Sequence, residues 1–168
     1  MKLNRFYLLI IIIAVSSCSR HELSSLDFEQ LNKPEKEIFL VSTAQHSTQE
    51  KALFELINNY RLSIALDTLA FEGASYYFAK KHSMYMISQG NTSHDNFAKR
   101  AEQLSMNTGA SYVAENVAKD YDTIDEAFEA WLESEGHRLN IEGDYTHSAI
   151  SIKENEEGDL YFTQLFFR

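Results

Sequence analysis

The stretch WLESEGHRLNI, residues 131–141, contains a tryptophan, two carboxylates, a serine, a histidine and an arginine within eleven positions. Ser134 and His137 are residue types that can form a nucleophile and its base. Glu133 and His137 stand four residues apart, which in a continuous helix places two metal ligands on one face. The segment is therefore either an active site or the end of a helix.

Helical geometry favours the end of a helix. Residues 123–126, Thr-Ile-Asp-Glu, have the form of a capping box, so we expect a helix from there to about residue 135. At about 100° per residue, Glu133 lies near 200° from Trp131 and faces solvent. The predicted buried stripe of this helix consists of Ile124, Ala127, Phe128 and Trp131.

Gly136 follows the last periodic residue, at a position where helices commonly end in left-handed geometry. His137 then lies beyond the helix, and its spacing from Glu133 no longer predicts a shared face. Ser134 lacks both the Gly-x-Ser-x-Gly pattern and the preceding strand of a nucleophile elbow. Ser134 and His137 therefore remain as residues that face inward or toward a cleft.

The rest of the chain predicts an α+β domain. A second capping box at residues 47–50 opens a helix with apolar residues at helical spacing to Ile64, and another helix is expected at about 72–88. Residues 96–104 favour a short helix, and 105–114 favour a loop. The alternating pattern from Ser148, followed by the turn NEEGD and the strand YFTQLFF, predicts a C-terminal hairpin. Helices first and a hairpin last indicate the α+β class.

The N-terminus reads as an export signal. Residues 1–17 combine Lys2 and Arg5 with the apolar run FYLLIIIIAV and two serines, and the run is too short to span a bilayer. Val15-Ser-Ser-Cys18 resembles a bacterial lipobox, in which the cysteine is lipidated and becomes the mature N-terminus. Residues 18–46 then read as a flexible tether and residues 47–168 as the folded domain.

The charge of the chain excludes some partners. Removing residues 1–17 leaves 13 basic and 25 acidic residues, a formal charge of −12 compared with −10 for the whole sequence. Such a surface argues against nucleic acid and against electrostatic docking on anionic lipid. Cys18 is the chain's one cysteine, so the domain has no internal disulfide and depends on an ordinary core.

Five separated motifs resemble the bacterial branch of the CAP superfamily, which includes cysteine-rich secretory proteins, antigen 5 and pathogenesis-related proteins. The resemblance covers about residues 50–168 and implies an α-β-α sandwich. The motifs are LINNYR (56–61), SHDNFAKR (93–100), AENVA (114–118), W-x-x-S-x-G-H-R-x-N-I (131–141) and YFTQLF (161–166).

The resemblance also implies a cleft lined by two histidines and two acids. His94 matches the first histidine and Glu115 the first acid, whereas the second acid falls on Ser134 and the second histidine on Tyr161. This chain therefore keeps half of the tetrad. Zinc needs three or four ligands, so a divalent metal is expected only if His137 turns into the cleft, and no cofactor is otherwise expected.

Each candidate also has a purely structural interpretation. His94 would cap a loop, and Glu115 would accept hydrogen bonds from backbone, Arg61 or Arg138. His82 lies on a core stripe and is expected to be a satisfied buried histidine. Roles in holding the fold or lining the sheet are expected for Asn58, Arg61, His147, Thr163, Leu165 and Phe167.

Three functions are compatible with these residues. The first is a membrane-anchored module outside the cytoplasm, in the outer membrane or at the cell surface, that binds a lipid, glycan or peptide. The second is a hydrolase or peptidase that uses His94 and Glu115, and the third is a structural envelope protein. A general base needs a partner and a tuned pKa, and half of the tetrad is missing, so a binding module is favoured over an enzyme.

Overall fold

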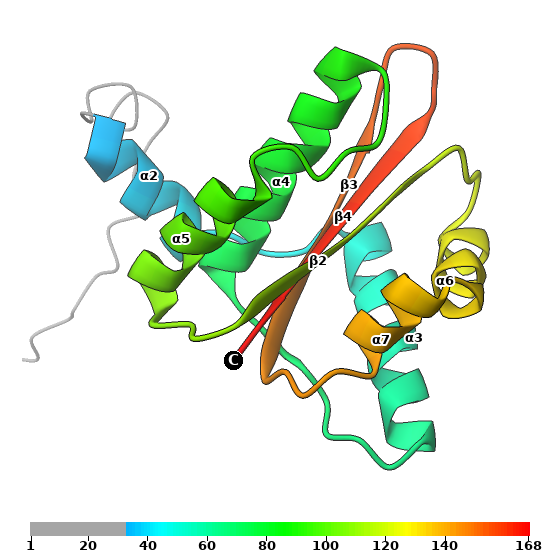
Figure 1. The fold of residues 1–168 in the computed structure, drawn as a ribbon. Helices are drawn as coiled ribbons and strands as arrows, with labels where there is room; N and C mark the ends of the chain where they lie inside the picture. Colours follow the sequence, from blue (N-terminus) through cyan, green and yellow to red (C-terminus); the bar gives the residue numbers. More distant parts are fainter. Residues whose placement is uncertain (1–32) are drawn as a thin grey trace, which may run out of the picture. The chain divides into compact units, whose positions relative to one another are not determined.

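The computed structural model of the protein describes residues 33–168 (Figure 1). The predicted signal at residues 1–17, the predicted lipidation site Cys18 and residues 19–32 lie outside this part of the chain. Among the described residues, no helix has both the length and the apolar character needed to cross a bilayer. The helices are α2 (Lys33–Ser42), α3 (Thr48–Ser63), α4 (Gly73–Gln89), α5 (Phe97–Thr108), α6 (Ile124–Glu133) and α7 (Glu135–Ile141).

Four strands form one sheet in the order β1-β3-β4-β2. The two long antiparallel pairs are β3 with β4 and β4 with β2, and β1 adds a short parallel pairing to β3 at Ala70 and Phe71. The predicted C-terminal hairpin is confirmed. The strands are β1 (Ala70–Phe71), β2 (Val113–Lys119), β3 (His147–Glu154) and β4 (Leu160–Phe167).

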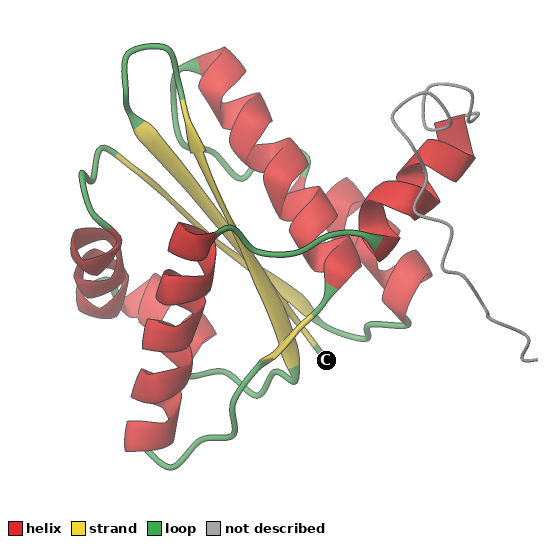
Figure 2. Ribbon diagram, turned by 180° about the vertical axis from the view of Figure 1, so that it is seen from behind, coloured by secondary structure: helices red, strands yellow, loops and turns green. Residues whose placement is uncertain are grey.

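Helices cover both faces of this sheet, as the views in Figures 1 and 2 show. The side chains of β4 alternate between the two layers. Phe162 and Phe166 pack with α3 and α6, where Trp131 is 1% exposed. Leu165 and Phe167 pack instead with α4 and α5. The expected α-β-α sandwich is therefore confirmed.

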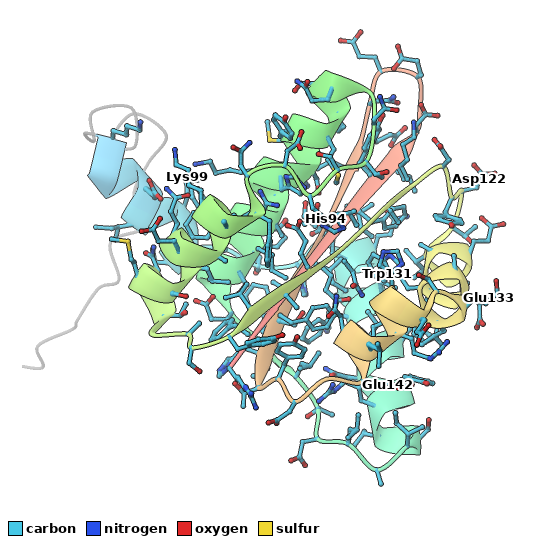
Figure 3. All side chains as sticks on the ribbon, viewed as in Figure 1. His94, Lys99, Asp122, Trp131, Glu133 and Glu142 are labelled. Carbon is cyan, nitrogen blue, oxygen red and sulfur yellow. The ribbon has the colours of Figure 1, made fainter. Side chains whose placement is uncertain are left out.

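The end of α6 differs from the prediction. The helix stops at Ser134, whose φ of −81° and ψ of 116° are extended, and α7 starts at the next residue. Gly136 lies inside α7 and does not end a helix. The predicted exposure of Glu133 is correct, and Figure 3 shows its side chain pointing away from the domain.

Two further segments differ from expectation. Helix α5 runs on to Thr108, into the region expected to be a loop, and ends at Gly109 with a positive φ of 78°. Residues 33–42, expected to belong to the tether, form α2. Proline is tolerated in the first turn of a helix, where its missing N–H would be unpaired in any case, so Pro34 is compatible with this start.

Side chains close both edges of the sheet. On β3, the backbone N–H of Ile150 donates to His46 Nε2 at 2.9 Å, and that of Ile152 donates to Glu50 Oε1 at 2.9 Å. On β2, Trp131 Nε1 donates to the carbonyl of Val117 at 3.4 Å. Because unpaired edge groups invite pairing with other chains, these contacts protect the sheet.

Asn140 completes the closure of β2. Its Nδ2 lies 3.2 Å from the carbonyl oxygen of Glu115 and 2.8 Å from Asn116 Oδ1, and Asn116 Nδ2 donates to the carbonyl of His137 at 3.1 Å. The stretch 131–141 therefore binds β2 at three successive residues. Its tryptophan and asparagine hold the fold together.

His46 must be neutral to accept the hydrogen bond from Ile150 at the edge of β3, because only an unprotonated Nε2 can accept a hydrogen bond. Its ring lies among Phe54, Phe71 and Tyr76, with centroid distances of 5.0, 4.6 and 5.6 Å. Burial among these rings lowers the pKa of His46 to about 4, although Glu50 acts in the opposite direction. The folded state therefore disfavours a charged His46.

We expect His46 to make the protein less stable in mild acid. The pKa of a histidine in the unfolded chain is near 6.5, so the unfolded state takes up the proton first as the pH falls. The full stability is present above pH 6.5, and about 3 kcal/mol of the free energy of unfolding is lost as the pH falls from 6.5 to about 4. Urea unfolding of wild type and His46→Gln across this range measures it. Equal pH dependence in the two proteins would contradict the assignment.

Candidate functional site

Glu115 is the centre of the site. It lies on β2, faces the layer of α4 and α5, and is 6% exposed. Arg100, in the first turns of α5, donates from Nε to Oε2 and from Nη2 to Oε1, both at 2.7 Å. This bidentate pair neutralises the carboxylate inside the protein, as a buried acid requires.

His94 is the second predicted residue that the structure brings to this site. Its Nδ1 lies 2.9 Å from Glu115 Oε1, while 55% of its side chain is exposed. The hydrogen bond to Glu115 raises the pKa of His94 above the usual 6.5, against the effect of partial burial. His94 therefore carries a positive charge over a wider pH range than a free histidine.

His82, on α4, lies next to the same carboxylate. Its Nε2 is 2.7 Å from the carbonyl oxygen of Ser93 and 3.7 Å from Glu115 Oε1. Burial lowers the pKa of His82, so the ring is neutral near pH 7 and its Nε2–H donates to Ser93. The prediction of a satisfied buried histidine agrees with this contact, which fixes the loop that presents His94. We call His82, His94, Arg100 and Glu115 the His94 cluster.

Ser134 and His137 lie together in a different hollow. This hollow has a volume of about 320 Å³ between β2, α6 and the start of α7, and Thr92 also lines it. The His137 ring packs against Trp131 at 6.4 Å, and its Nδ1 is buried with no hydrogen-bond partner among the described residues. Burial lowers the pKa of His137, with the charge of His94 acting in the same direction.

Tyr161 and the other predicted partners lie elsewhere. The Tyr161 ring is 2% exposed and packs with Met86 and Val117 in the layer beneath α4. Arg61 binds the carbonyls of Asp67, Ile141 and Gly143, and Arg138 binds that of Leu132, so neither contacts Glu115. Arg61 therefore has the fold-holding role expected of it. The hydrogen bonds expected from Arg61 or Arg138 to Glu115 are not formed.

Arg100 is the site residue that sequence reasoning missed. It ends the motif SHDNFAKR, six positions after His94, and the turn at Asn96 brings both side chains to Glu115. The sequence did contain one indication of its role: Arg100 is a basic residue in the first turns of the helix that follows the loop with His94. Figure 3 shows His94 and Trp131 on opposite sides of β2, which separates the His94 cluster from the packed tryptophan.

The donor set does not fit a metal ion. Both oxygens of Glu115 already accept from Arg100, whose permanent charge would repel a cation placed beside them. His94 offers its Nδ1 to the same carboxylate. No group of three His, Cys, Asp or Glu side chains within residues 33–168 is arranged to hold a metal.

A family model described as "CAP: Cysteine-rich secretory protein family" matches residues 54–166. The chain is 30% identical over 128 residues to an uncharacterized membrane protein, YlbC, of Bacillus subtilis. That match includes 73% of this chain and 35% of the relative, so the chain spans about a third of the relative's length.

Solved structures share the fold. An outer surface protein from Borrelia burgdorferi superposes with a TM-score of 0.66 at 17% identity, over 74% of this chain and 96% of that one. An extracellular protein with an SCP domain from Bacillus anthracis gives 0.63 at 23% identity, over 75% and 45% of the two chains. These likenesses concern the fold alone.

We expect Arg100 and Glu115 to be strongly coupled in stability. Arg100→Met leaves a buried carboxylate without its counter-ion and should lower the free energy of unfolding by about 3–5 kcal/mol. The pair Arg100→Met with Glu115→Gln should recover part of that loss, since no charge is then stranded. Denaturant unfolding of both single variants and the double variant measures the coupling.

The exposed ion pair between Arg168 and Asp144 supplies the control. Arg168→Ala should change the free energy of unfolding by less than about 1 kcal/mol, as is usual for surface pairs. If Arg100→Met costs no more than this control, Glu115 is not the buried, Arg-neutralised group described above.

Proposed function

The chain belongs to the cysteine-rich secretory protein (CAP) family, and we propose that it is a binding module of the cell envelope. Its ligand is a lipid, glycan or peptide that carries a carboxylate or phosphate group, and the His94 cluster binds that group. The observation that carries this proposal is the half-exposed ring of His94, which contacts a carboxylate that Arg100 already neutralises and whose pKa that carboxylate raises.

The charges of the cluster favour an anion. Glu115 and Arg100 cancel, and burial keeps His82 neutral near pH 7, so protonated His94 leaves one uncompensated positive charge. A hollow of about 170 Å³ beside it, between α4 and α5, is lined by three cations, Lys81, Lys99 and Arg100, and by one acid, Asp95. The excess of positive charge at this place favours an anionic ligand, although the chain as a whole has a formal charge of −10.

Binding is favoured over hydrolysis because the carboxylate that would act as a general base is already engaged. Both carboxylate oxygens of Glu115 accept charge-assisted hydrogen bonds from Arg100. A purely structural role is also less favoured, because the exposed ring of His94 has Glu115 as its one hydrogen-bond partner in the described chain. The fold does not need an exposed cation there.

The proposed location is outside the cytoplasm, with a lipid anchor at Cys18. The signal-like residues 1–17 and the lipobox-like Val15–Cys18 support export and acylation. The relatives support the same compartment, since they are described as an outer surface protein, an extracellular protein and a membrane protein. A cysteine acylated more than once would hold the chain stably on a membrane.

Sulfate tests the anion site, because its charge is constant across the pH range in which a histidine titrates. We expect sulfate titration, followed by NMR chemical shifts of residues around Glu115, to show binding at about pH 6. Binding should weaken by about threefold or more as the pH rises through the raised pKa of His94. His94→Ala should bind sulfate as weakly at about pH 6 as wild type does at about pH 9.

The matched control is His147→Ala. This histidine stacks on Phe167 at 4.8 Å, outside the His94 cluster, so its removal should leave sulfate binding unchanged. Equal sulfate affinity in His94→Ala and wild type at the lower pH would refute the anion site.

A further inference from the structure

Helix α2 packs tightly on the domain and forms part of its surface. The backbone of Gly73, at the start of α4, lies so close to the end of α2 that a Cβ there would be 2.5 Å from the carbonyl oxygen of Val41. A residue other than glycine would push α2 away. The Val41 side chain packs against the core cluster beneath α4 and α5. The orientation of α2 on these helices is therefore specified by contacts.

The outer side of this helix layer carries exposed apolar side chains. Ile38, Leu40 and Met84 are 69%, 40% and 57% exposed, and they are three of the nine large exposed hydrophobic residues in the described chain. A hollow of about 440 Å³ beside α2 is lined by Leu40, Met84 and Tyr77 among others. A second hollow of about 360 Å³ is lined by Ile38 on α2 and by Asn107 near the end of α5.

The charge around the larger hollow is the reverse of that of the whole chain. Lys80 and Lys81 line the larger hollow, and no acid does among the described residues. Glu37 is the one acid of the described chain that lines the smaller hollow. Apolar side chains next to lysines match the interface of a bilayer, where aliphatic groups enter the acyl boundary and lysine ammonium groups reach lipid phosphates. The overall negative charge of the chain does not oppose contact at this place.

The position of the proposed anchor allows this surface to reach the membrane. Lys33, the first residue of α2, follows Cys18 by fifteen residues, a span of at most about 50 Å. A domain of this length has a radius of gyration of about 14 Å, so a segment of that span is long enough for α2 to reach the bilayer. Among the described helices, α2 is the first after the anchor. Anchoring also raises the effective concentration of lipid, so a weak contact suffices.

We propose that the surface formed by Ile38, Leu40 and Met84 with Lys80 and Lys81, the α2 face, lies on the bilayer to which the chain is anchored. The inference rests on the anchor in the proposed function. Lys81 also lines the 170 Å³ hollow beside the His94 cluster, so contact of the α2 face with lipid puts that hollow next to the headgroups.

A fluorescent probe tests this contact in the full chain. With Cys18 acylated, Met84→Cys supplies the one free thiol for the polarity-sensitive dye NBD, and Leu139→Cys is the matched control. Leu139 lies on α7 and is 60% exposed, close to the 57% of Met84. Both labelled proteins are reconstituted into phosphatidylcholine vesicles that carry doxyl-labelled lipid as a quencher.

We expect quenching at position 84 to exceed that at position 139 by about threefold or more, because doxyl lipids quench dyes that enter the bilayer. Adding Ile38→Asp to the Met84→Cys protein should abolish the difference, since a carboxylate resists insertion. Equal quenching at positions 84 and 139 in protein that floats with the vesicles would overturn the proposal. A concentration-dependent blue shift at position 84 without vesicles would also overturn it, because a second copy would then cover the face.

The anchor is tested separately. Failure of the full chain to float with vesicles refutes acylation at Cys18 but leaves the α2 face open to test. In that case a chain with a polyhistidine tag in place of residues 1–18, which lie outside the compact unit Lys33–Arg168, is held on nickel-chelating lipid. Preferential quenching at position 84 in this tethered chain supports the α2 face, and equal quenching refutes it.

Discussion

The bidentate pair between Arg100 and Glu115 is the interaction on which the site depends. A carboxylate buried on the face of a sheet is costly unless a counter-ion and hydrogen bonds accompany it, and Arg100 supplies both. With Glu115 already neutralised, its remaining hydrogen bond goes to His94 and holds that ring at the surface. The pair thus allows a buried carboxylate to hold an exposed histidine ring by a hydrogen bond.

The same pair explains why the site differs from a metal centre and from a catalytic dyad. A metal would need free carboxylate oxygens, and a general base would need a carboxylate or imidazole with an available lone pair and a suitable pKa. Arg100 occupies the carboxylate oxygens, and the raised pKa of His94 favours its protonated form. This arrangement is the basis of the proposed binding of an anionic group.

Closure of the two sheet edges is the second constraint on the fold. Trp131 and Asn140 bind the outer carbonyls of β2, and His46 and Glu50 bind the outer N–H groups of β3. The stretch WLESEGHRLNI, with its apparently catalytic composition, acts mainly in this closure. Its serine and histidine line a hollow, whereas its tryptophan and asparagine hold α6 and α7 against the sheet.

Much of the fold could be predicted because its signals are local. Capping boxes mark the starts of α3 and α6. Alternation of apolar and polar residues, followed by a turn, marks the C-terminal hairpin. The break at Ser134 was missed because α7 restarts at once and is held by contacts with β2, which no local pattern contains. The pairing of His94 with Glu115 followed from the family resemblance, whereas Arg100 required knowledge of how α5 packs on β2.

The most direct test of the account is the titration of the His94 ring by ¹⁵N NMR in wild type and in Glu115→Gln. The account predicts that His94 titrates above pH 6.5 in wild type and that the variant loses this rise, because the hydrogen bond to Glu115 causes it. A His94 that titrates at or below pH 6.5 in wild type, or identically in both proteins, would contradict the central claim.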